Sequence, residues 1–302
     1  MTVVLAHKTV AMIDAMIYED DGAKFRTLLG TLIGSAGDAY EGQKDEFRSH
    51  LGASMIGREC PRELWYNFHW AKAPKFEGRM QRLFNRGHLE EPRFVAMLMM
   101  LGCKVWAHDD QGNQFRITGC GGHFGSALDG VIGDCPDVPN EPILGEFKTH
   151  NDKSFKKLVA SGCKIAKFDH FVQQQIYMGY YKLKKSLYLA VNKNDDMLYG
   201  EIIEFDQAIC DMYNTRAEKI IFGHNIPDRI SDNSGYYKCK YCNFHDLCHV
   251  SAIPRVNCRT CAGSVPIADG TWQCIKFATT INKQVQLVGC KEYDRKIEFM
   301  PS

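Results

Sequence analysis

The chain has 302 residues, enough for one large domain and a small appendage. Its 45% apolar and 24% charged residues are typical of a globular protein and argue against a disordered chain. A formal net charge of +1 excludes a uniformly basic protein, so nucleic-acid binding would depend on local basic patches. The sequence shows no apolar run of membrane-spanning length and no secretory leader, so we expect a cytoplasmic protein with no membrane contact.

The first third of the chain is predicted to be helical. Residues 1–50 carry an apolar helical face whose role the sequence does not reveal, and residues 79–101 repeat apolar side chains at three- and four-residue steps up to Gly102, a typical C-terminal stop. Within the second helix, Glu90 and Glu91 are alternative candidate carboxylates, and His88 lies close to them in sequence. Pro92 removes a backbone hydrogen bond there and predicts a kink.

Two strand-like runs follow, each with acidic residues. Residues 124–132 form the first run, which breaks at Asp129, and residues 143–149 form the second, which contains Glu146-Phe147-Lys148. Because side chains alternate along a strand, Glu146 and Lys148 share one face while Phe147 packs behind. Carboxylate oxygens suit a hard divalent cation, and the lysine could orient a water beside it. A solvated strand with a cross-strand ion pair remains the alternative interpretation.

The rest of the central region completes an α/β pattern. A basic segment carries Lys148, Lys153, Lys156, Lys157, Lys164 and Lys167. The helix expected over residues 170–183 places Gln173 and Tyr177 on one face, aimed at a cleft or at the core. Strands over 187–191 and 198–205 and a helix over 207–222 follow. The pattern predicts a mixed central sheet flanked by helices.

These motifs resemble the PD-(D/E)XK nuclease superfamily, in particular its RecB-type and phage (lambda-exonuclease-like) exonuclease branch. Gly87 to Pro92 is similar to the helical first motif and points to Glu91, and Asp129 is similar to the second-motif aspartate. Glu146 and Lys148 match the E-x-K element, and Gln173 and Tyr177 match the Q-x-x-x-Y helix. The resemblance covers roughly residues 50–250 in the family's order. Leu128 stands where the family often has proline.

The resemblance implies a restriction-endonuclease-like core and a metal-dependent DNA exonuclease of phage-type recombination, repair or degradation. Glu91, Asp129, Glu146 and the backbone carbonyl of Phe147 would hold Mg²⁺ or Mn²⁺. Lys148, Gln173 and Tyr177 would complete the catalytic set. DNA is the expected partner, and a recombination or replication protein is compatible with this role. An endonuclease of the same fold and a non-catalytic nucleic-acid-binding protein remain alternatives, and an iron–sulfur radical enzyme is disfavoured because no C-x3-C-x2-C signature occurs.

The thirteen cysteines give a second signal, because in a chain without a secretory leader they more often bind metals than form disulfides. Cys239, Cys242 and Cys248 form a C-x2-C-x5-C array that needs a fourth ligand, for which Cys60 is the candidate. One cysteine before a nuclease core and three after it resemble the AddB-type and CRISPR-adaptation nucleases. That resemblance implies a [4Fe–4S] cluster, with zinc as the alternative.

A second group contains Cys258, Cys261, Cys274 and Cys290. A C-x2-C knuckle with two later cysteines predicts a zinc ribbon, and residues 251–302 are too few for a good apolar core without one. The predicted division is therefore a helical region (1–50), a nuclease core bracketed by cysteines (51–250) and a zinc-ribbon-like module (251–302). The other five cysteines are interpreted as ordinary core or surface residues.

Overall fold

The computed structural model describes residues 3–40, 47–223 and 225–296. The chain divides into two compact units, each assembled from separated segments. The first, here called the sheet unit, comprises residues 1–44, 76–117 and 127–210. The second, here called the cysteine unit, comprises residues 45–75, 118–126 and 211–302 and includes all eight cysteines of the two predicted groups. The predicted boundaries at residues 50 and 250 follow chain order and stay a prediction.

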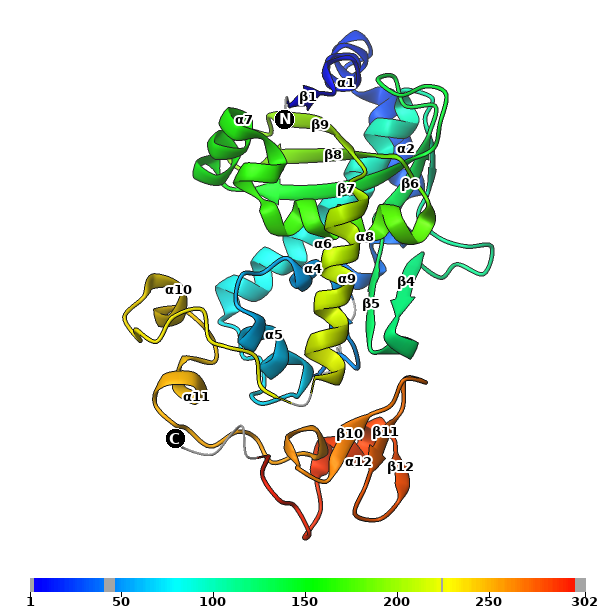
Figure 1. Ribbon diagram of the computed structural model, residues 1–302. Helices are drawn as coiled ribbons and strands as arrows, with labels where there is room; N and C mark the ends of the chain where they lie inside the picture. The colour runs from blue at the N-terminus through cyan, green and yellow to red at the C-terminus, as the bar shows by residue number, and fades with distance from the viewer. Residues whose placement is uncertain (1–2, 41–46, 224, 297–302) are drawn as a thin grey trace. The chain divides into compact units, whose positions relative to one another are not determined.

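The sheet unit is built on a six-stranded sheet of order β1-β9-β8-β7-β6-β3. The strands are β1 (Val4–Leu5), β3 (Lys104–Trp106), β6 (Gly130–Gly133), β7 (Ile143–His150), β8 (Lys185–Asn192) and β9 (Leu198–Glu204). Strands β7 and β8 are parallel, whereas every other neighbouring pair is antiparallel. Figure 1 shows β9, β8 and β7 side by side. The predicted α/β class with a mixed central sheet is confirmed.

Helices cover both faces of this sheet. They are α1 (His7–Glu19), α2 (Ala23–Thr31), α3 (Gly37–Tyr40), α6 (Gly78–Met100), α7 (Asp152–Ala166) and α8 (Phe168–Tyr181), with a 3₁₀ turn η1 (Ile33–Ala36). On one face Phe147 of β7 stacks on Phe94 of α6, with ring centroids 5.2 Å apart. On the other face Ser186 of β8 donates to Gln174 of α8 over 2.7 Å. The two faces of the sheet therefore meet different helices.

The cysteine unit holds short elements. They are β2 (Leu51–Gly52), α4 (Ala53–Ile56), α5 (Pro61–Phe68), the 3₁₀ turns η2 (Cys120–Gly122) and η3 (Cys258–Thr260), α10 (Tyr237–Lys240), α11 (His245–His249) and α12 (Lys283–Val288). Strands β10 (Ser264–Pro266), β11 (Trp272–Cys274) and β12 (Thr279–Ile281) form a small antiparallel sheet. Strands β4 (Arg116–Gly119) and β5 (Phe124–Ala127) and helix α9 (Gln207–Phe222) each carry residues of both units.

Local chemistry explains several element boundaries. Pro61 begins α5, where its missing N–H costs nothing. Gly102 follows the C-cap of α6 with φ +88°, the left-handed conformation that glycine adopts without strain. Gly162, with φ +73° and ψ 168°, interrupts α7 near its C-terminal end.

Helix α6 continues through Pro92. The run over residues 124–132 breaks at Asp129, as expected, but its two parts, β5 and β6, belong to different sheets. The chain changes sheet at Leu128-Asp129, which places Asp129 immediately before β6. Within the described residues, no helix combines the length and the apolar character needed to cross a membrane.

Candidate metal and active site

Asp129, Glu146 and Lys148 converge at the junction of β6 and β7. The antiparallel register pairs Gly130 with Gly145, so the next residues of the two strands, Asp129 and Glu146, lie opposite each other. Its carboxylate accepts a hydrogen bond of 2.7 Å from the backbone N–H of Phe147. The shared face predicted for Glu146 and Lys148 is observed, because the two side chains form an ion pair.

The ammonium group of Lys148 lies among three oxygen donors. Its Nζ forms the ion pair with Glu146, lies 3.7 Å from Asp129 Oδ2 and donates to the backbone carbonyl of Phe147 over 3.2 Å. The resemblance described above implies that these same three residues bind a divalent cation. The lysine therefore acts as a stand-in cation, and it shows that these oxygens face a common point.

Glu146 is the most constrained of these groups, because its side chain is 0% exposed. Apart from the ion pair with Lys148, neither carboxylate oxygen has a hydrogen-bond partner among the described residues. Burial raises the pKa of Glu146, the ammonium of Lys148 opposes that shift, and the charges of Asp129 and Glu91 add to it. A metal ion bound to such a buried carboxylate would offset both its loss of solvation and the repulsion from the neighbouring acids.

The structure distinguishes the two candidate glutamates of α6. Glu91 lies within electrostatic reach of Glu146, and its side chain is 3.6 Å from the imidazole of His88. Glu90 is largely buried and pairs instead with Arg93 at 3.3 Å. Of the two glutamates, Glu91 is thus the one whose charge acts on Glu146.

Gln173 and Tyr177 lie on α8 and interact directly. Gln173 donates to the Tyr177 hydroxyl over 3.0 Å, and both side chains are buried. Tyr177 also acts electrostatically on Lys148. Tyr177 is therefore within electrostatic reach of the ammonium group.

A buried network next to Lys148 was not predicted from the sequence. The Tyr188 hydroxyl lies 2.9 Å from His150 Nε2 and 2.9 Å from His170 Nδ1, and Ser154 contacts the other nitrogen of His150 at 3.1 Å. Burial lowers the pKa of His150 to about 3, helped by Lys167 and Lys148. The alternation along β7 could have indicated that His150 shares a face with Glu146 and Lys148. Tyr188 could not be found in this way, because it comes near only through the β7–β8 register, which pairs it with Glu146.

The first cysteine group comes from three places in the cysteine unit. Cys60 precedes α5, Cys239 lies on α10, Cys242 follows it, and Cys248 lies on α11. After burial, the thiols of Cys248 and Cys60 are the causes that raise the pKa of Cys239, and both also raise that of Cys242. The thiols of Cys60 and Cys248 are thus within electrostatic reach of Cys239 and Cys242.

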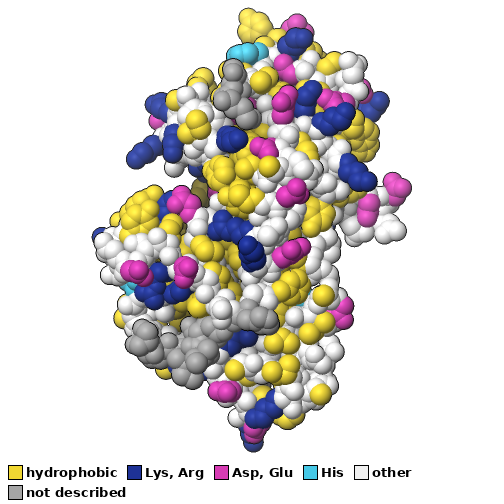
Figure 2. Space-filling view, in the orientation of Figure 1, with side chains coloured by type: hydrophobic (Ala, Val, Ile, Leu, Met, Phe, Trp, Pro, Cys, Tyr) yellow, Lys and Arg dark blue, Asp and Glu magenta, His cyan; other side chains and the backbone are white. Residues whose placement is uncertain are grey.

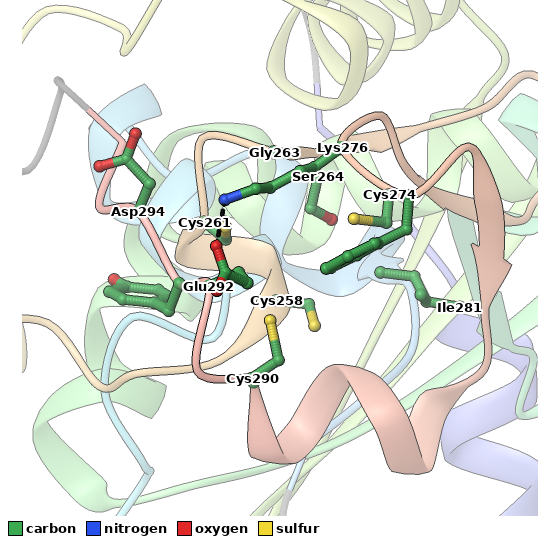
Figure 3. A pocket seen from close by; sticks show the side chains of 13 residues that line it. Cys258, Cys261, Gly263, Ser264, Cys274, Lys276, Ile281, Cys290, Glu292 and Asp294 are labelled. Carbon is green, nitrogen blue, oxygen red and sulfur yellow. Dashed lines mark hydrogen bonds and ion pairs between the residues drawn. The ribbon is translucent and has the colours of Figure 1, made fainter.

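The second group also converges. Cys258, Cys261, Cys274 and Cys290 line one pocket, shown in Figure 3. Burial and then the thiols of Cys261, Cys290 and Cys274 raise the pKa of Cys258 to about 11. Of the remaining cysteines, Cys103, Cys135, Cys163 and Cys210 are buried and Cys120 is half-buried.

Neither group, nor the carboxylates, already has the geometry of a metal site. Over residues 3–40, 47–223 and 225–296, no set of three or more His, Cys, Asp or Glu side chains is placed so as to hold an ion. The ligand assignments are therefore proposals that rest on the neighbourhoods described above.

Comparisons with known proteins find only remote likenesses. No family model and no curated protein matches the chain. A solved structure described as SSO0001 is 17% identical with a TM-score of 0.36, covering 74% of this chain and 95% of that chain. The alkaline exonuclease LHK-Exo from Laribacter hongkongensis is 18% identical with a TM-score of 0.40, and its complex with dAMP is 17% identical with a TM-score of 0.42. Both cover 57% of this chain and 86% of that chain.

Proposed function

We propose that this protein is a metal-dependent deoxyribonuclease that hydrolyses phosphodiester bonds, and that it acts as an exonuclease. The observation that carries the proposal is the convergence of Asp129, Glu146 and the Phe147 carbonyl on the Lys148 ammonium. An all-oxygen donor set beside a lysine suits Mg²⁺ or Mn²⁺ and phosphoryl chemistry. A solvated ion pair does not account for a fully buried Glu146.

Each residue has a role in this proposal. Glu91, Asp129, Glu146 and the Phe147 carbonyl would hold the ion, which when bound supplies Lewis acidity toward a phosphate oxygen and toward water. Lys148 would leave its present position among these oxygens and donate a hydrogen bond to the attacking water. Gln173 and Tyr177 would orient the scissile strand next to Lys148.

DNA would approach along α7. Lys153, Lys156 and Lys157 are exposed on this helix, and Lys164 and Lys167 are half-buried. Figure 2 shows Lys and Arg side chains gathered on the region that α7 occupies in Figure 1. One of these lysines, Lys156, pairs with Asp152 at 2.9 Å. Such a segment after the catalytic strand would bind the phosphate backbone.

The test is Mg²⁺- or Mn²⁺-dependent digestion of end-labelled linear DNA beside a closed circle. We expect the linear DNA to be degraded and the circle to persist. Both Asp129→Ala and Lys148→Ala should lower the rate at least 100-fold, because removal of one group that stabilises a transition state has an effect of this size. Lys185→Ala, on the neighbouring strand β8, is the matched control and should keep full activity. Cutting of the circle would replace the exonuclease by an endonuclease. Binding of DNA without turnover would favour a non-catalytic binding protein.

We propose further that Cys60, Cys239, Cys242 and Cys248 hold a [4Fe–4S] cluster. Polar contacts join the segments that carry them: Arg62 donates to the Pro227 carbonyl over 2.7 Å, and Lys72 pairs with Asp246 at 2.7 Å. Four thiolates suit either a cluster or zinc. Anaerobically purified protein should show the brown absorbance of a cluster, and Cys242→Ser should abolish it. Zinc at this site without iron would contradict the cluster.

A further inference from the structure

Four cysteines from three separate segments meet in the pocket of the cysteine unit. Cys258 and Cys261 lie on and next to η3, Cys274 ends β11, and Cys290 follows α12. Figure 3 shows their side chains around one hollow. All four are free thiols. The Lys276–Glu292 ion pair, 2.5 Å long, also lines the pocket.

Between the first two cysteines lies Arg259, a positively charged side chain that is only 2% exposed. Its guanidinium carbon lies 3.7 Å from the ring centroid of Trp70, 4.6 Å from that of Trp272 and 5.3 Å from that of Phe68. These three rings form an aromatic cage around it, and cation–π attraction offsets part of the cost of burial.

The hydrogen-bond donors of the guanidinium group are paired with neutral acceptors around the cage. Its nitrogens donate to the Gln286 side chain and to the backbone carbonyls of Phe68 and Ser49, each over 2.9 Å. Arg259 forms no ion pair with a carboxylate among the described residues. A buried cation without a counter-ion is costly and needs a scaffold that holds it in place.

The C-x2-C segment from Cys258 to Cys261 is placed to hold the Arg259 side chain in position. Asn257 accepts from the backbone N–H of Arg259 over 2.8 Å and donates to the Trp70 carbonyl over 3.0 Å. Fixing the thiols of Cys258 and Cys261 would fix the backbone of the two residues between them. The Cys274 thiol lies two residues from the cage residue Trp272, on the same strand. One ion bound by these cysteines would thus hold both the segment of Arg259 and the strand of Trp272 in place.

We propose that Cys258, Cys261, Cys274 and Cys290 bind one Zn²⁺ ion, and that this ion is a structural lock that holds Arg259 in the aromatic cage of Phe68, Trp70 and Trp272. The inference does not depend on nuclease activity. Zinc accepts four thiolates in tetrahedral structural sites and contributes folding free energy directly.

The first test is elemental analysis of the full-length protein. We expect about one zinc per chain, lost in Cys258→Ser/Cys261→Ser and retained in Cys239→Ser/Cys242→Ser, which changes the other C-x2-C pair. Cys120→Ser, half-buried in the same unit and outside the pocket, is a second control. Iron that is lost in Cys258→Ser/Cys261→Ser, or a disulfide between any two of the four cysteines, would overturn the assignment.

The second test asks whether bound zinc holds the aromatic cage in place, which the metal content alone does not show. It uses wild-type protein, so it does not require the double variant to fold. Wild-type protein is stripped with a chelator and then titrated with Zn²⁺ alone while tryptophan emission is followed. Removal should shift the emission to longer wavelength, re-addition should reverse the shift, and Trp272→Phe should lower its amplitude. Arg259→Gln should still bind zinc but show a smaller shift. Complete loss of zinc without any change in emission would refute the coupling to the cage.

Discussion

At the residue scale, the site depends on one buried carboxylate and the single lysine that pairs with it. Glu146 is 0% exposed and Lys148 is 23% exposed. In the absence of a metal, the lysine is the charge that makes the buried acid tolerable. The same lysine is proposed to act in catalysis, so stability and activity are linked at this position.

Removing that lysine should destabilise the metal-free protein. We expect Lys148→Ala to lower the free energy of unfolding by on the order of 3 kcal/mol, because a buried acid loses its partner. Lys185→Ala breaks the half-exposed pair with Glu141, 2.8 Å long, and should lower the free energy of unfolding much less, because solvent screens this pair. Urea unfolding at pH 7 with a chelator present measures both values. Equal losses would show that Lys148 does not support Glu146.

At the element scale, what could be predicted from the sequence follows the range of the interactions. Helix α9 begins and ends at the predicted residues, because its apolar period is local. Strand β1 was not predicted, since two residues become a strand only by pairing with β9. The approach of Asp129 to Glu146 and Lys148 was expected from motif order, whereas the Tyr188 network required the β7–β8 register. Contacts between distant segments, such as Arg259 with Trp70, leave no periodic signal in the sequence.

The interruption of α7 gives a test of local strain. Gly162 has φ +73°, and an added Cβ would lie 2.6 Å from a methyl group of Val3. We expect Gly162→Ala to lower the free energy of unfolding by about 1–3 kcal/mol, the usual cost of a residue held in such a conformation. Gly30→Ala, in α2 with nothing within 4 Å of the added Cβ, should instead be neutral or stabilise by up to about 1 kcal/mol. Thermal unfolding of both variants decides the point, and a harmless Gly162→Ala would contradict the described backbone.

At the scale of the whole molecule, buried histidines should make the protein sensitive to acid. Burial lowers the pKa of His150 to about 3 and lowers that of His170 well below its usual range. The folded state therefore binds fewer protons than the unfolded state between about pH 6.5 and pH 3, so stability falls as pH falls through this window. His150→Asn should flatten the dependence of the free energy of unfolding on pH. An unchanged slope would show that His150 is protonated in the folded state.

The basic helix α7 gives a prediction about binding. With Ca²⁺ in place of Mg²⁺ to suppress cleavage, we expect Lys153→Ala/Lys156→Ala/Lys157→Ala to weaken DNA binding and to reduce the slope of log K against log salt by about 0.9 for each phosphate that the variant no longer neutralises. Alanine at Lys8, Lys104 and Lys291, exposed elsewhere, is the charge-matched control. If both triple variants change the slope equally, α7 is not a specific DNA surface.

If the oxygens around Lys148 form a divalent cation site, metal-free protein should bind Mn²⁺ in a calorimetric titration. We expect saturable binding that Asp129→Asn weakens at least 10-fold, whereas Asp137→Asn, at a carboxylate that binds Thr9 instead, leaves it unchanged. Binding of equal affinity in wild type and Asp129→Asn, or no binding at all, would contradict the proposed site.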